Sequence, residues 1–312
     1  MNRSVGLGCL ICLLLACKEE RSVNATNTSK STEIPDAISL FGDSLFSPEP
    51  TEKLQGRFKE HENNYLKDST KVENLIWYGR FVAYKGDYLD AIAIFSNGML
   101  QYPDDARLYR HRGHRYITIR QFDDAIKDYG RAVQLIQGKP NEIEPDGMPN
   151  ARNIPISTLH GNIYYHLGLA HYLNWDLEKA LDAYKNCLST GGKPDNLVSA
   201  THWIYMILQL LNRKEEAKKY LEPIHKEMDI IENMAYHELC LFYKGEMGLE
   251  ELEKNFSETP GSDGIKYGIA NWHFYNGEKE MAKKKLKQLV NQKSWNSFGY
   301  IAAESQLKKY FQ

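Results

Sequence analysis

Arginines and histidines cluster in one short stretch of the chain, residues 109–116, which reads YRHRGHRY. Arginine guanidinium groups bind carboxylates and phosphates through two parallel hydrogen bonds, and tyrosines offer a flat contact area at low entropic cost. The stretch therefore predicts a site for an acidic peptide, a carboxylate-bearing small molecule or a glycan. The alternative is that these charged side chains only solvate an exposed helix face.

The ten histidines of the chain raise the question of metal binding. A metal site needs several ligands that converge in the correct geometry. No H-E-x-x-H or similar spacing is present, and His160, His166 and His171 are spaced to point in different directions on one helix. His171 takes a place that a packing aromatic usually fills. We therefore predict no metal and no cofactor.

Sequence motifs of other enzyme chemistry are also absent, because the chain has no nucleophile elbow, phosphate loop or dinucleotide fingerprint. Residues far apart in a sequence still converge in some active sites. The histidines that such a site would use are His114, His202 and His237, which we expect on neighbouring helices. An enzyme with a histidine-based or metal-dependent active site therefore remains the alternative to a binding protein.

The start of the chain has the features of a secretory signal peptide. It begins MNR, and the apolar run from Val5 to Ala16 is too short to cross a bilayer of roughly 30 Å as a permanent helix. The next feature, LLAC at residues 14–17, resembles a bacterial lipobox. This resemblance implies removal of residues 1–16 and acylation of Cys17. An ordinary signal peptide with an incidental cysteine is the alternative.

The residues after Cys17 suggest where the protein is carried. Residues 18–20 read KEE and resemble the lysine-plus-acidic export signal of surface lipoproteins in the Bacteroidetes. No aspartate follows Cys17 directly, which fits transport to the outer membrane better than retention at the inner one. The resemblance thus implies an outer-membrane lipoprotein of the bacterial cell envelope and favours surface display. Since nothing after residue 16 is apolar enough to span a membrane, the lipid on Cys17 is the expected membrane anchor.

Removal of the signal peptide changes the cysteine count and the charge. Besides Cys17, only Cys187 and Cys240 remain, and we expect both on buried helix faces as small hydrophobic residues. The chain has 39 Lys and Arg against 41 Asp and Glu, and the loss of Arg3 leaves 38 against 41. This near-neutral balance argues against nucleic acid as a partner.

Two segments precede the regular part of the chain. Residues 17–34 are polar, rich in Ser, Thr and Asn and free of aromatics, so we expect a lipidated, disordered tether. Residues 35–71 contain apolar side chains and a helical stripe of Leu54, Phe58 and Leu66. We expect this second segment to cap the first repeat.

One internal spacing recurs through residues 72–312. A residue that is small in most copies is followed twelve positions later by an alanine, and an aromatic or leucine follows that alanine by four. The pairs are Gly79–Ala91, Gly113–Ala125, Gly168–Ala180, Tyr205–Ala217 and Ala270–Ala282, and the residues that follow are Phe95, Tyr129, Tyr184, Leu221 and Leu286. A short turn sequence lies inside each pair. Each unit therefore reads as two amphipathic helices joined by a tight turn.

This pattern resembles the tetratricopeptide repeat (TPR), whose signature combines W-x2-L-G-x2-Y with A-x3-F and P at a period of about 34 residues. The first unit matches it with Leu75, Tyr78, Gly79, Ala91, Phe95 and Pro103. The resemblance covers residues 72–290, with three clear and three weak units. It implies an all-α fold, a right-handed superhelical α-solenoid of about six TPR helix pairs with N- and C-terminal capping helices, the latter at 294–311.

In this family the first helix of each unit lines a concave groove that binds peptides or partner proteins, and no catalytic residues come with the fold. Positions three before and one after the small residue are expected to face that groove. The candidate residues are Arg80, Arg110, His114, Tyr165, His202, His237, Tyr267 and Asn271. We therefore predict a lipid-anchored scaffold whose groove binds a protein, peptide or glycan partner.

The repeat pattern is interrupted once, at residues 138–158, which contain four prolines and two glycines. Loops of this length in compact domains are usually functional or disordered. The turn-forming sequence at 145–147, PDG, favours a shaped loop, and proline-rich disorder is the alternative. We expect the insertion to fold over the groove near His160 as one wall of the binding site. Its candidate residues are Asp146, Asn150, Arg152 and Asn153.

Overall fold

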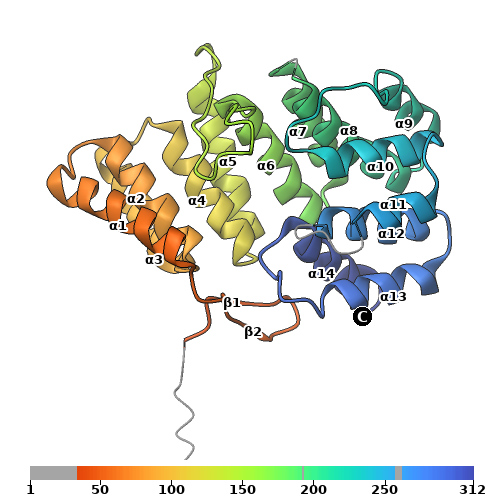
Figure 1. The fold of residues 1–312 in the computed structure, drawn as a ribbon, viewed down its shortest axis with the longest axis horizontal. Helices are drawn as coiled ribbons and strands as arrows, with labels where there is room; N and C mark the ends of the chain where they lie inside the picture. The colour runs from red at the N-terminus through yellow and green to blue at the C-terminus, as the bar shows by residue number, and fades with distance from the viewer. Residues whose placement is uncertain (1–33, 192, 257–261) are drawn as a thin grey trace, which may run out of the picture. The chain divides into compact units, whose positions relative to one another are not determined.

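The computed structural model describes residues 34–191, 193–256 and 262–312 (Figure 1). The chain divides into two units, Met1–Ile34 and Pro35–Gln312. The predicted signal peptide, Cys17 and the tether up to residue 33 lie outside the described residues. All the elements discussed below belong to the second unit.

The described part of the second unit contains two short strands and fourteen helices. Their bounds are β1 (Ala37–Ile38), β2 (Ser44–Leu45), α1 (Glu52–Lys67), α2 (Val72–Tyr84), α3 (Tyr88–Gln101), α4 (Ala106–Thr118), α5 (Phe122–Ile136), α6 (Leu159–Leu173), α7 (Leu177–Ser189), α8 (Pro194–Leu210), α9 (Lys214–Leu221), α10 (Met234–Lys244), α11 (Leu249–Phe256), α12 (Asp263–Tyr275), α13 (Lys279–Leu289) and α14 (Phe298–Tyr310). The strands pair antiparallel, with Ala37 opposite Leu45.

The helices from α2 to α13 form six antiparallel pairs, α2–α3 through α12–α13, which follow one another along the chain (Figure 1). A residue with positive φ ends the first helix of every pair and lets the chain reverse within a few residues. These residues are Gly86, Arg120, Trp175, Asn212, Gly245 and Gly277. Five of the six turns coincide with those that the repeat spacing predicts.

The small residues of the repeat lie where two helices of a pair cross. A Cβ added to Gly79 would lie 2.7 Å from the ring of Phe95, and one added to Gly113 would lie 2.8 Å from the ring of Tyr129. Gly168 and Tyr184 repeat this contact at 2.8 Å. The sixteen-residue spacing therefore places an aromatic ring of the second helix against a glycine of the first. The predicted all-α solenoid of helix pairs is confirmed.

Both ends of the array are covered by additional helices. At the start, α1 packs on α2, where the rings of Tyr65 and Tyr78 stack at 4.9 Å. At the other end, α14 packs on α12 and α13. It also reaches back to the third pair, because the Ser305 hydroxyl donates to the backbone oxygen of Leu173 at 2.7 Å. The C-terminal helix thus covers the last pair and also contacts the middle of the array.

A buried ion pair fixes this return of the chain. Arg120 Nε lies 2.8 Å from Glu304 Oε2, and their side chains are 3% and 1% exposed. The other Glu304 oxygen accepts a hydrogen bond from the Leu40 backbone at 2.8 Å, and Arg120 Nη2 donates to the Trp295 backbone oxygen at 2.8 Å. One charge pair therefore connects the turn after α4, helix α14 and the N-terminal hairpin.

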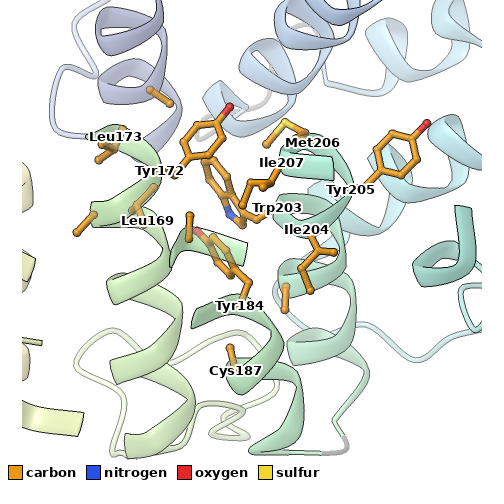
Figure 2. Close-up of a cluster of buried hydrophobic side chains, with 14 of the residues drawn as sticks. Leu169, Tyr172, Leu173, Tyr184, Cys187, Trp203, Ile204, Tyr205, Met206 and Ile207 are labelled. Carbon is orange, nitrogen blue, oxygen red and sulfur yellow. The ribbon is translucent and has the colours of Figure 1, made fainter. Parts of the chain in front are cut away.

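Aromatic side chains fill the core between α6, α7 and α8 (Figure 2). The Trp203 ring stacks on Tyr184 at 5.9 Å and meets the edge of Tyr172 at 5.0 Å. Cys187 lies in this core, and both Cys187 and Cys240 are free and buried, as the sequence predicts. Burial raises the pKa of the Cys187 thiol to about 12. Among the described residues, no helix is long and apolar enough to cross a bilayer.

Candidate functional site

The insertion between α5 and α6 lies along the first helices of several pairs. The Gly147 backbone oxygen accepts from Arg57 Nη1 of α1 at 2.7 Å, and the Pro145 oxygen accepts from Arg80 Nη1 of α2 at 3.0 Å. Farther along the loop, Arg152 Nη1 lies 2.7 Å from Asp229 Oδ1, just before α10. The loop therefore spans the distance from α1 to the segment that precedes α10.

Local hydrogen bonds give this loop a defined shape despite its prolines. At its base, Ile143 forms an isolated antiparallel bridge with Thr158. At its tip, the Asn150 side-chain oxygen accepts from the backbone nitrogens of Arg152 and Ile154 at 3.1 and 3.3 Å. Asn153 takes a left-handed conformation, with φ of 52°. Asparagine tolerates this conformation better than most residues, so the turn suits its sequence.

A first cavity of about 140 Å³ lies between α2, α4, the loop and the start of α6. Its lining combines cationic, acidic and aromatic side chains. The residues are Arg80, Ala83, Tyr84, Phe95, Arg110, His111, His114, Arg115, Glu144, Pro145, Asp146, Ile156, Ser157 and Asn162. The basic stretch of α4 thus meets the acidic part of the insertion.

Glu144 of the loop is the acidic residue of the cavity that lies against this basic stretch. Its Oε2 lies 3.2 Å from Arg110 Nε, and its Oε1 lies 3.3 Å from His111 Nε2. Asn162 donates a further hydrogen bond to Oε2. Because Arg110 Nη1 can only donate to His111 Nδ1, 2.9 Å away, the imidazole proton resides on Nε2 and faces Glu144. The chain therefore presents its own carboxylate to Arg110.

Arg115 lies in the same cavity without such a partner. Arg115 is only 9% exposed, and the described residues give its side chain no hydrogen bond and no ion pair. Its guanidinium lies 5.8 Å from the Tyr88 ring. Burial lowers the pKa of Arg115, yet an arginine remains charged in a protein. The cavity therefore contains a buried positive charge that no carboxylate of the described chain balances.

The histidines beside this cavity are neutral. Burial, followed by the charge of Arg110 or Arg115, holds the pKa values of His111 and His114 well below the usual range. Burial lowers the pKa of His166 to about 3. The rings of His114 and His166 lie 4.7 Å apart, and neither brings a positive charge to the site at neutral pH.

A second cavity of about 260 Å³ adjoins the first and shares Ile156, Ser157 and Asn162 with it. Its lining is mostly uncharged, with hydroxyl, amide and aromatic groups. Its other residues are Thr158, Gly161, Tyr165, His166, Gly191, Lys193, Asn196, Ser199, Glu232, Asn233, Tyr236 and Phe298. The Tyr165 hydroxyl accepts from Trp203 Nε1 at 2.8 Å and lies 3.4 Å from the Tyr236 hydroxyl.

The structure brings together half of the groove residues predicted from the sequence. Arg80, Arg110 and His114 line the first cavity, and Tyr165 lines the second. Asp146 of the insertion also reaches the first cavity. The other loop candidates have structural contacts, since Arg152 pairs with Asp229, Asn150 bonds to Glu232 and Asn153 forms the turn.

The remaining four predicted residues line neither cavity. His202, Tyr267 and Asn271 are fully buried, and His237 is nearly so. His202 stacks on Tyr236 at 4.8 Å, and Asn271 accepts a hydrogen bond from Gln306 of α14 at 3.0 Å. His202 is thus covered by α10 and Asn271 by α14, whereas His237 contacts the His225 backbone oxygen and Tyr267 contacts Tyr172 of α6. The four predicted residues therefore belong to the core.

The sequence predicts that His114, His202 and His237 approach one another, but the described structure shows no ring contact between any two of them. His114 contacts His166 and Phe298, whereas His202 contacts Trp203, Tyr236 and Tyr243. Within the ranges that the structure describes, no group of three or more His, Cys, Asp or Glu is arranged to hold a metal.

Several cavity residues escaped the reasoning from sequence. Arg115 lies in the YRHRGHRY stretch, but it is two positions after Gly113. Groove residues were expected three positions before and one position after that glycine. Glu144 is the buried acidic residue of the insertion and lies two positions before the predicted Asp146. Phe298 comes from α14, and no local signal connects it with this site.

No family model and no curated protein sequence matches the chain. Among solved structures, it is similar to MamA, with 20% identity and a TM-score of 0.42 over 62% of this chain and 92% of that one. It is also similar to YrrB, described as a TPR protein with an unusual peptide-binding site (13% identity, TM-score 0.42, 80% and 99% covered). A TPR protein from Parabacteroides merdae gives 14% identity and a TM-score of 0.49, with 80% and 92% covered. Because these identities and TM-scores are low, the fold assignment rests on the helix packing described above and not on these similarities.

Proposed function

We propose that this protein is a binding module that holds a segment of a partner protein in the two adjoining cavities. The observation that carries the proposal is that both cavities share Ile156, Ser157 and Asn162. Together they form one groove, lined by first helices from α2 to α10 and by the insertion.

The groove lining suits an extended peptide. Tyr165 and Tyr236 supply rigid aromatic contact area, and tyrosine gives such area at low entropic cost. Asn162, Asn196 and Asn233 supply amide groups that both donate and accept hydrogen bonds, as a peptide backbone requires. A glycan would use the same amides and rings, so it is a possible finding of the experiment below.

We further propose that the protein is anchored in the bacterial cell envelope through a lipid on Cys17. The support is the resemblance of residues 14–17 to a lipobox and of residues 18–20 to a surface-export signal. Metabolic labelling with an alkyne-bearing fatty acid tests this directly, since the wild-type chain is expected to be labelled and Cys17→Ser is not. Digestion of intact cells with a protease then tests surface display.

Crosslinking in living cells tests the binding function. A photoreactive phenylalanine analogue replaces Tyr236 in the second cavity, and in a matched control it replaces Tyr220, a half-buried tyrosine on α9 outside both cavities. We expect discrete crosslinked products from position 236 and none of these products from position 220. The same products from both positions, or none from position 236, would contradict the proposal.

A further inference from the structure

We propose that Arg115 binds one carboxylate group of the ligand inside the first cavity, next to the carboxylate that the chain itself supplies through Glu144. This inference rests on the proposed groove, because it names the chemistry of the ligand part that enters the first cavity. The carboxylate belongs either to an acidic side chain or to a peptide C-terminus.

The first argument is the contrast between Arg115 and the other arginines of α4. Arg107 pairs with Asp105 at 2.6 Å, and Arg112 pairs with Asp128 at 2.7 Å. Arg110 lies 3.2 Å from Glu144. Arg115 is buried more deeply than these three and has no carboxylate partner in the described chain. A buried charge is strongly unfavourable unless it is paired, so a ligand carboxylate is the missing partner.

The second argument is that two further arginines, Arg110 and Arg80, line the same cavity. Arg110 Nε is buried and makes no hydrogen bond, because its position beside Glu144 gives an ion pair without the required alignment. Arg80 Nη1 is held by the Pro145 oxygen, which fixes its guanidinium at the cavity wall. A carboxylate beside Arg115 would therefore lie in a cavity lined by two further arginines, one of which the loop holds in place.

The charge of the lining selects a singly charged ligand group. Three arginines and two carboxylates, Glu144 and Asp146, line the cavity, which leaves one positive charge. His111 and His114 add none, because burial keeps their pKa values low. One carboxylate neutralises this charge. A phosphate group, with about −1.5 to −2 at neutral pH, would leave an excess of negative charge beside Glu144.

The cavity also limits the size of the bound group. Its volume is about 140 Å³, and one water needs roughly 10–15 Å³ of such space. A carboxylate with a short carbon stem fits, and the rest of the ligand continues into the larger second cavity past Ile156 and Ser157. The first cavity therefore suits the end of a side chain or of a peptide.

Melting of the full chain with small probes tests the site without knowledge of the partner. The probes are N-acetylalanine, which carries a terminal carboxylate, and the α-amide of N-acetylglutamate, which carries a side-chain carboxylate. Sodium chloride at equal ionic strength is the reference. A ligand that binds only the folded state raises the melting temperature with concentration. We expect at least one probe to raise it above the chloride reference, and the larger shift identifies the source of the carboxylate.

Variants connect this shift to Arg115. Arg115→Gln is expected to abolish it, whereas Arg131→Gln, which removes an exposed arginine of α5 that pairs with Asp104, is expected to retain it. Without probe, Arg115→Met is expected to melt at the wild-type temperature or above, because it removes an unbalanced buried charge. The proposal is overturned if neither probe shifts the wild type or if Arg115→Gln retains the shift. It is also overturned if Arg115→Met melts far below wild type, because the fold would then already satisfy the charge.

The two proposals fail separately. Crosslinks from position 236 without a carboxylate shift would remove only the role of Arg115. A carboxylate shift without crosslinks would remove only the partner protein and leave a site for small carboxylates.

Discussion

Helices α4 and α13 are both strongly basic, but the arginines of α4 are paired or buried, whereas most lysines of α13 are exposed. The four arginines of α4 are Arg107, Arg110, Arg112 and Arg115, and α13 carries five lysines. Three of the arginines pair with carboxylates, and Arg115 is buried at the cavity. On α13, Lys279, Lys284 and Lys287 are exposed. Positive charge by itself therefore does not identify a candidate site, whereas a buried arginine at a cavity without a carboxylate partner does.

The difference follows from the place of each helix in the array. Helix α4 is a first helix and packs against α2, α3, α5 and α6, with the insertion along it. Helix α13 is a second helix and packs mainly against α12 and α14. A guanidinium is weakly hydrated and makes several directed hydrogen bonds, so it suits a buried position better than the strongly hydrated ammonium of lysine. The residue types thus agree with the burial of the two helices.

The largest change in the free energy of unfolding is expected from substitution of a paired arginine of α4. Arg112 binds both oxygens of Asp128, at 2.8 and 2.7 Å, and the Asp128 side chain is only 6% exposed. Arg112→Met leaves this carboxylate buried and unpaired, which we expect to lower the free energy of unfolding by about 3 kcal/mol. Urea denaturation monitored by circular dichroism measures the change.

A second substitution checks the cause of that loss. In Arg112→Met/Asp128→Leu both charges are absent, so we expect most of the lost free energy of unfolding to return. A double variant as unstable as the single one would show that packing of the arginine stem, rather than the unpaired carboxylate, is responsible.

The pH dependence of stability gives an effect of intermediate size. The pKa of His166 is about 3 in the folded chain and near 6.5 in an unfolded one. Below pH 6.5 the unfolded state therefore binds a proton that the folded state does not. Stability falls as the pH drops, by up to about 1.4 kcal/mol per pH unit for each such histidine.

A variant of His166 isolates this contribution. We expect His166→Phe to have a shallower loss of unfolding free energy between pH 7 and pH 5 than the wild type. In the control Lys283→Gln on α13 the dependence stays as in the wild type, since lysine does not titrate in this range. Equal slopes for His166→Phe and the wild type would mean that His166 takes up a proton in the folded state.

The smallest effects are expected on α13. Lys287 is exposed and forms no ion pair within the described ranges, so Lys287→Gln should change the free energy of unfolding by less than about 0.5 kcal/mol. Lys285 lies 2.7 Å from Glu253 in a partly exposed pair, for which Lys285→Gln should lose about 0.2–1 kcal/mol. A loss as large as that of Arg112→Met at either position would contradict the distinction between the two helices.

Much of the fold was predictable because its signals are local. The contacts of Gly79 with Phe95 and of Gly113 with Tyr129 follow directly from the sixteen-residue spacing. The candidate site was predictable only in part. Arg80 and Arg110 lie at the cavity, as their positions relative to the small residue of each repeat predict. Tyr267 has an equivalent position in its repeat but lies in the core. Its neighbour Tyr172, whose hydroxyl lies 2.5 Å away, belongs to another helix pair.

The sequence by itself determined the helix pairs, five of their six turns and the position of the insertion. Helical periodicity, small residues at helix crossings and turn residues involve positions within a few dozen residues of one another. These signals can therefore be recognised in the sequence alone. Only the tertiary structure decided which first-helix side chains stay accessible. The reason is that the covering elements come from distant parts of the chain, the insertion over Arg110 and α14 over Asn271. Their packing depends on contacts such as Arg120 with Glu304, which no local pattern encodes.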